Sequence, residues 1–222
     1  MLSFNWGFFS TIIIILALLL ILRWAQKAAV SSKELALIAT LAALAALGRV
    51  PFAAVPSVQP TTFLVIVSGF VFGPQAGFMV GATSALVSNF FLGQGPWTPW
   101  QMIGWGLVGL GSAYLYRLRP HISPLGLAIF GALWGFLFGW IQDLGFWLIF
   151  VYPLSLNTLI AASVSSIAFD AAHAAGNFLL CLFFAAVVIR ILREYKERLE
   201  ISYVCRQKTR KDIFNSKEKE KN

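Results

Sequence analysis

The stretch from Val50 to Tyr116 contains no charged residue, and this constrains the fold more than any other feature of the chain. At about 20 residues per helix, such a run can cross the roughly 30 Å hydrocarbon layer of a bilayer three times. Only helices and closed β-barrels satisfy their backbone hydrogen bonds inside lipid, and the apolar runs lack the alternation of barrel strands. The sequence therefore predicts an all-α, polytopic helical membrane protein.

Composition agrees with this class, because 59% of the residues are hydrophobic and only 12% are charged, whereas soluble domains carry about 25% charge. The net charge of +8 does not indicate nucleic acid, since the basic residues flank apolar runs and crowd the C-terminus. Cys181 lies in an apolar run and Cys205 in the charged tail, so they predict no disulfide framework. We expect the lipid bilayer as the surroundings and no nucleic-acid partner.

The chain divides into three parts by its apolar runs and charges. Residues 1–32 are expected to form an N-terminal transmembrane anchor (Phe4 to Leu22) and a cytoplasmic link, because the positive charge follows the apolar run. A cleaved signal peptide, which carries its positive charge first, is the alternative. Residues 33–193 are expected to form a six-helix membrane domain, and residues 194–222 a charged cytoplasmic tail.

Six further apolar runs predict the spans of this membrane domain. They are Glu34 to Gly48, Thr61 to Phe72, Gln75 to Leu92, Trp100 to Tyr116, Pro124 to Gln142 and Thr158 to Ile189. Asp143 is expected to close the span before it, and Leu144 to Asn157 to form an outer loop or a re-entrant segment. If the N-terminus lies outside, every Lys and Arg except Arg49 falls on the cytoplasmic side, which predicts a cytoplasmic C-terminus.

Small residues recur every four positions, which allows close helix packing in membranes. Gly73, Gly77 and Gly81 predict a smooth face on one span. Alanines of the run Glu34 to Gly48 have the same spacing and offer a surface either to a partner or to the rest of the same chain.

Polar residues inside a membrane mark candidate sites because they are costly there. Asp170, His173 and Asn177 lie within about 60° of one another on a helix. They predict either a ligand-binding or gating cluster, or a hydrogen-bond network that joins helices. A metal site is disfavoured, because Asp170 and His173 supply only two ligands.

A second polar group lies at the expected outer surface, in the Gly-, Pro- and Trp-rich connection Gly93 to Trp100. Pro96 and Pro99 constrain this connection, and indole rings with nearby amides are typical of a concave site for a large, mostly neutral organic ligand. Membrane-surface anchoring is the alternative for its tryptophans. No P-loop, H-E-x-x-H or G-x-S-x-G motif occurs, so the sequence indicates neither an ATPase nor another familiar enzyme.

Four segments of the chain resemble the substrate-binding S components of energy-coupling factor (ECF) vitamin transporters. They are Gln59 to Thr62 (QPTT), Gly73 to Phe78 (GPQAGF), Ser88 to Met102 (SNFFLGQGPWTPWQM) and Phe169 to Asn177 (FDAAHAAGN). The resemblance covers about Lys33 to Arg193, and it is closest to the cobalamin type. The additional span at Phe4 to Leu22 departs from the six-helix pattern of the family.

The resemblance implies a multi-pass subunit of a prokaryotic cell membrane that captures a vitamin at the outer face and releases it inside by toppling. A T component and two ATP-binding subunits would drive it, the T component docking on Ala39, Ala43 and Ala46. No cofactor, metal or catalytic residue is implied. The candidate substrate-binding residues are Asn89, Gln94, Trp97, Thr98, Trp100, Gln101, Asp143, Asp170, His173 and Asn177.

Two other functions remain open from the residues alone. An intramembrane enzyme would use Asp170 and His173 as acid and base. A stand-alone secondary transporter would couple uptake to protons or sodium through a buried acid such as Asp170.

Overall fold

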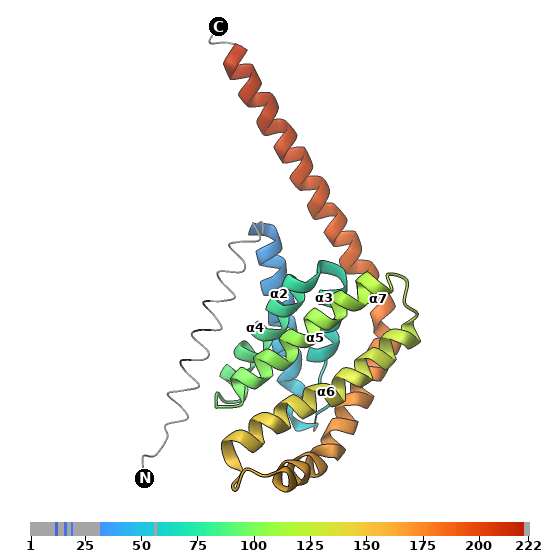
Figure 1. Ribbon diagram of the computed structural model, residues 1–222. Helices are drawn as coiled ribbons and strands as arrows, with labels where there is room; N and C mark the ends of the chain where they lie inside the picture. The colour runs from blue at the N-terminus through green and yellow to red at the C-terminus, as the bar shows by residue number, and fades with distance from the viewer. Residues whose placement is uncertain (1–11, 13–15, 17–18, 20–31, 56, 220–222) are drawn as a thin grey trace.

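The computed structural model describes residues 32–55 and 57–219, together with Ile12, Leu16 and Leu19, and it describes side chains as far as Arg198. Figure 1 shows the whole chain. The expected N-terminal span Phe4 to Leu22 and its link to the membrane domain lie almost wholly outside the described residues.

The described part of the chain is helical and contains no strand, which confirms the predicted all-α class. Its elements are α2 (Ser32–Arg49), the 3-10 helix η1 (Pro51–Ala54), α3 (Thr61–Phe72), α4 (Pro74–Leu92), α5 (Thr98–Leu118), α6 (Pro124–Phe150) and α7 (Leu156–Lys219). Four segments of this part, Ser32–Ala54, Pro74–Leu92, Pro124–Phe150 and Leu156–Arg198, are long and apolar enough to cross a membrane.

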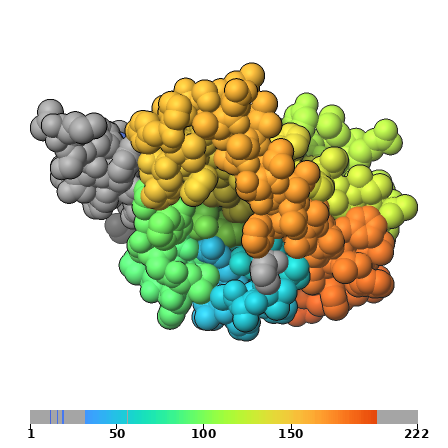
Figure 2. Space-filling model, turned by 90° about the horizontal axis from the view of Figure 1, so that it is seen from below, coloured from blue at the N-terminus to red at the C-terminus, as the bar shows by residue number. Residues whose placement is uncertain are grey.

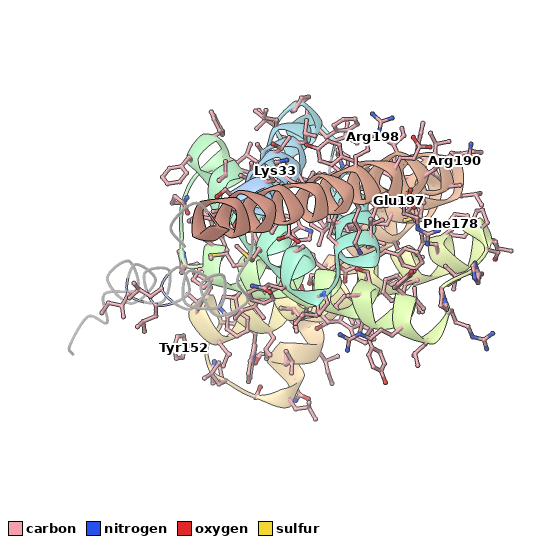
Figure 3. The ribbon with its side chains drawn as sticks, turned by 90° about the horizontal axis from the view of Figure 1, so that it is seen from above. Lys33, Tyr152, Phe178, Arg190, Glu197 and Arg198 are labelled. Atoms are coloured by element: carbon pink, nitrogen blue, oxygen red, sulfur yellow. The ribbon has the colours of Figure 1, made fainter. Side chains whose placement is uncertain are left out.

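Successive helices run in alternating directions, so the connections gather at two opposite ends of the bundle (Figure 1). The loop end carries the connections 50–60, 93–97 and 151–155. The tail end carries the turn at Gly73, the connection 119–123 and the part of α7 that leaves the bundle. Figure 3 looks down on the tail end, with Lys33 at the start of α2 and Arg190 and Arg198 on α7.

The core lies around α3, which packs against α2, α4, α5 and α7. Glycines bring α4 and α5 together, because a Cβ atom on Gly77 would lie only 2.7 Å from the carbonyl oxygen of Gly109. Gly81 packs in the same way against the Trp105 backbone. Gly73 does not belong to this face; its φ of +91° instead makes the turn between α3 and α4.

Helix α6 differs from the prediction, since it continues past Asp143 to Phe150. Asp143 does not end the helix because its carboxylate accepts a hydrogen bond from Ser166 of α7 and is buried between the two helices. Of the two alternatives expected for Leu144 to Asn157, the outer loop is therefore wrong for residues 144–150, and only residues 151–155 connect α6 to α7.

Helix α7 is tied to the tail end before it leaves the bundle. Lys196 Nζ donates to the carbonyl oxygen of Val71 over 3.1 Å, and the Arg193 guanidinium lies 5.8 Å from the Phe70 ring centroid. Beyond these contacts α7 extends through the charged tail to Lys219 (Figure 1).

Candidate functional site

A buried arginine holds together three segments at the loop end. Arg49, at the C-terminus of α2, is only 9% exposed. Its Nη1 atom donates to Ser88 Oγ over 2.8 Å and to Asn89 Oδ1 over 2.7 Å, and its Nε atom donates to Gln59 Oε1 over 3.0 Å. The guanidinium also lies 5.0 Å from the ring centroid of Trp105, in cation–π geometry.

Asn89 extends this arrangement into the start of α5. Its Nδ2 atom donates to Thr98 Oγ1 over 2.9 Å and to Gln101 Oε1 over 2.8 Å. Thr98 Oγ1 in turn donates to Gln94 Oε1 over 2.9 Å. The five-residue connection 93–97, which begins at Gly93 with a φ of +103°, places these side chains together. We call Arg49, Gln59, Ser88, Asn89, Gln94, Thr98 and Gln101 the Arg49 cluster.

The two tryptophans of this connection have different environments. Trp97 is 43% exposed, its ring packs on Gly95, and its Nε1 atom donates to the Gly93 carbonyl oxygen over 3.3 Å. Trp97 therefore covers its own turn. Trp100 is half-buried and contacts α6, where a Cβ atom on Gly145 would lie 2.6 Å from the indole ring.

Below the Arg49 cluster, Trp105 connects α5 to α3, α6 and α7. Its Nε1 atom donates to Thr62 Oγ1 over 2.8 Å, and the same hydroxyl lies 2.8 Å from His173 Nε2. The Phe138 ring stacks on Trp105 at 4.6 Å and meets the His173 ring edge-on at 5.2 Å. Arg49 thus contacts the Trp105 ring, and His173 contacts Thr62, the hydrogen-bond partner of Trp105.

A pair of buried carboxylates joins α6 and α7. Ser166 Oγ lies 2.7 Å from Asp143 Oδ2 and 3.3 Å from Asp170 Oδ2, so its single O–H group can donate to either carboxylate, with Asp143 the nearer acceptor. The Asp170 carboxylate packs directly against Gly139. Among the described residues no basic side chain forms an ion pair with either acid, and no hydrogen bond links Asp170 to His173. The described part also contains no group of three His, Cys, Asp or Glu residues that could hold a metal ion.

Asn177 is fully buried and lies one turn beyond His173 on α7. Neither its Nδ2 nor its Oδ1 atom has a hydrogen-bond partner among the described residues. Of the three alanines expected to dock a partner, Ala39 and Ala43 are exposed, whereas Ala46 is completely buried inside the bundle.

The structure brings Asn89, Gln94, Thr98 and Gln101 into one cluster. Asp143 and Asp170 form a separate pair, and His173 joins the Trp105 group. Sequence reasoning did not include Arg49 among the site residues. The sequence did contain a signal for Arg49, because it is the one basic residue outside the expected cytoplasmic segments. Its position is therefore not explained by the enrichment of Lys and Arg on the cytoplasmic side of membrane proteins.

The loop end is hollowed (Figure 2). The recess lies between the α6–α7 region (yellow to orange), the α4–α5 connection (green) and the segment that follows α2 (cyan). Atoms from the end of α2 (blue) are visible at its floor. The segments that supply the Arg49 cluster therefore meet around this recess. We call it the loop-end recess.

Comparison with known proteins gives a family match over most of the chain. The family model described as "ECF transporter, substrate-specific component" matches residues 33–185. A UPF0397 protein of Vibrio atlanticus is 34% identical over 85 residues, which cover 36% of this chain and 46% of that relative. UPF0397 proteins of Aliivibrio fischeri and Aliivibrio salmonicida are 32% identical over 85 residues, with the same coverage. The chain thus spans less than half the length of these curated relatives, and no solved structure matches it significantly.

Proposed function

The chain belongs to the family of substrate-specific components of ECF transporters, and we propose that it captures a vitamin at the outer face of a prokaryotic cell membrane. Proteins of this family are transporter subunits and not enzymes. The proposed substrate is cobalamin or another vitamin of comparable chemistry, following the resemblance of the segment Ser88 to Met102 to cobalamin-type components.

The observation that carries this proposal is the Arg49 cluster beside the loop-end recess. Buried polar side chains are unfavourable in a membrane bundle, and here four of them, Arg49, Ser88, Asn89 and Thr98, gather at the loop end. The three glutamines of the cluster bond to them and are partly or largely exposed. A concave surface with a few fixed polar groups and aromatic rings is typical of an organic-ligand site. Asn89, Thr98 and Gln101 belong directly to the proposed site, and Trp100 and Gln94 border it.

The remaining candidate residues have different proposed roles. Asp143, Asp170 and His173 lie deeper, between α6, α7 and α3, where they are available to a substrate that reaches below the recess. Trp97 and Asn177 are weaker candidates, because the first packs on its own turn and the second is sealed in the core.

The loop end is proposed to face outside, with the C-terminus in the cytoplasm. The basic residues support this orientation, since those of α2, α5 and α7 other than Arg49 lie toward the tail end. The N-terminus is then outside if the span Phe4 to Leu22 is retained. The division into residues 1–32, 33–193 and 194–222 is proposed on the same basis, and the family match over 33–185 supports its central part.

A T component and two ATP-binding subunits are the proposed partners. The exposed small residues Ala36, Ala39 and Ala43 form a stripe on α2 that would let a partner helix approach closely. Ala46 is buried in this conformation and does not contribute to that surface.

Binding and uptake assays test the proposal together. Purified full-length protein is titrated with labelled cobalamin and then with a panel of other vitamins. Uptake is measured in cells that express the protein with and without a T component and its ATPases. We expect tight binding of one vitamin and uptake only with the complete, ATP-hydrolysing complex. If the protein bound none of the vitamins tested, the proposal would be contradicted.

A stand-alone secondary transporter is the second candidate, and the buried pair of Asp143 and Asp170 favours it. This function predicts uptake without ATP that collapses when the proton or sodium gradient is dissipated. The intramembrane-enzyme hypothesis receives no comparable support, because Asp170 and His173 bind Ser166 and Thr62 respectively and not each other in the described part.

A further inference from the structure

The positive charge of Arg49 has no anionic partner among the described side chains. Its hydrogen-bond acceptors are the neutral oxygens of Gln59, Ser88, Asn89 and Gln101. An arginine that is nine-tenths buried at the end of a membrane helix usually pairs with a carboxylate, because a desolvated charge without a counter-ion is unfavourable. Asp143 and Asp170 do not supply that counter-ion, since neither is bonded to Arg49 in the described part and both lie beside Ser166.

Arg49 also has unused hydrogen-bonding capacity. A guanidinium offers five N–H donors. The bonds to Gln59, Ser88, Asn89 and Gln101 use Nε and Nη1, and Nη2 makes no hydrogen bond to any described residue. One side of the group is therefore held in place while the other end of the fork remains available. The two N–H groups of Nη2 can therefore still donate to the oxygens of a carboxylate or phosphate.

The environment keeps Arg49 from serving as an ordinary interfacial anchor. Arginines at membrane surfaces usually extend toward the headgroups. Arg49 instead reaches inward to α4, where it bonds Ser88 and Asn89, and it lies over the Trp105 ring. The segments around it line the loop-end recess (Figure 2). The charge is thus fixed within the bundle, next to a hollow that opens at the loop end.

We propose that the substrate of this protein carries an anionic group, a carboxylate or a phosphate, which binds Arg49 in the loop-end recess. This inference rests on the proposed function as a substrate-binding subunit. It also changes the expectation from sequence of a mostly neutral ligand, because a fixed, unbalanced cation selects for the opposite charge. The neutral members of the Arg49 cluster would orient the rest of the polar substrate.

The experiment compares anionic vitamins with neutral analogues of nearly the same shape. Full-length protein in phosphatidylcholine nanodiscs is titrated with nicotinate and nicotinamide, pantothenate and pantothenol, and biotin and biotinamide, which test a carboxylate. Cobalamin and cobinamide, which lacks the phosphodiester, test a phosphate. We expect one anionic member to bind roughly 10- to 100-fold more tightly than its analogue, the worth of a hydrogen bond to a charged group.

Three variants test whether Arg49 causes this preference. Arg49→Gln should bring the affinity for the anion down to that for the neutral analogue, whereas Arg49→Lys should keep part of the preference. Arg190→Gln removes an equal charge at an exposed position of α7 and should leave the preference unchanged. If Arg49→Gln does not give folded protein by gel filtration and circular dichroism, the inference is tested on the other two proteins. It then requires that the wild type prefers the anion and that Arg49→Lys has a reduced preference.

The outcomes separate this inference from the proposed function. If a neutral or cationic vitamin binds tightly and Arg49→Gln does not change its affinity, the inference is overturned while the proposed function stands. If no vitamin binds, the proposed function fails and the inference fails with it. An anionic lipid is tested as another source of the same chemistry. If adding phosphatidylglycerol to the nanodiscs abolishes anion binding to the wild type, Arg49 binds a headgroup and the substrate assignment is wrong.

Discussion

Two buried asparagines offer a matched test of what the Arg49 cluster contributes to stability. Asn89 is 1% exposed and Asn177 is 0% exposed. Asn89 accepts one hydrogen bond from Arg49 and donates to Thr98 and Gln101, whereas Asn177 has no side-chain partner in the described part of the chain. The same substitution at the two positions therefore removes the same atoms but different numbers of hydrogen bonds.

The expected difference follows from these bonds. Asn89→Ala removes one hydrogen bond to a charged group, worth about 1.5–3 kcal/mol, and two neutral ones, worth about 0.5–1.5 kcal/mol each. The sum is about 2.5–6 kcal/mol. We expect a value in the lower half of this range, because Arg49 keeps its hydrogen bonds to Ser88 and Gln59 and is not left without partners. Asn177→Ala removes two buried groups that have no partner, so the relief of their desolvation offsets the small cavity.

Unfolding of both variants is measured in mixed micelles with increasing dodecyl sulfate, followed by circular dichroism and tryptophan fluorescence. We expect Asn89→Ala to lose about 2.5–4 kcal/mol and Asn177→Ala to change by less than about 1 kcal/mol. Equal losses at the two positions would refute the reasoning, because the hydrogen bonds of Asn89 would then contribute nothing beyond packing.

Three further predictions use other contacts. Asn89→Asp places a carboxylate 2.7 Å from Arg49 Nη1, where it should pair with the guanidinium and balance its charge. Anion binding should then weaken roughly 10-fold or more while the protein stays folded, and an unchanged affinity in the titration would contradict this. Gly77→Ala should destabilise the protein by about 1–3 kcal/mol, because the new Cβ atom would lie 2.7 Å from the Gly109 carbonyl oxygen; an unchanged unfolding midpoint would show that α4 and α5 separate freely. Ala43→Trp should abolish ATP-driven uptake without changing vitamin affinity, since Ala43 is exposed on α2, and uptake at the wild-type rate would exclude this docking surface.

Local features of the sequence predicted the helices well where a turn residue marks their ends. The span Thr61 to Phe72 matches α3, and the start of α4 at Pro74 follows the glycine turn. The end of α6 was missed because a charged residue in an apolar run usually marks a boundary. Asp143 is tolerated inside the helix only because Ser166 of another helix lies beside it.

The candidate site was predicted in part. Asn89, Thr98 and Gln101 were chosen from their closeness in sequence, and the short connection 93–97 does bring them together. Arg49 precedes Asn89 by 40 residues, and its contact with α4 depends on how α2 packs beside that helix. No local pattern carries that information.

The amino-acid sequence alone determined that this protein is a helical membrane protein and where most of its helices begin, because hydropathy, glycine and proline act over a few neighbouring residues. Only the tertiary structure decided which polar side chains meet. That choice depends on the rotation and close approach of helices distant in sequence, through which Arg49 is buried among neutral acceptors and Asp143 is placed beside Asp170.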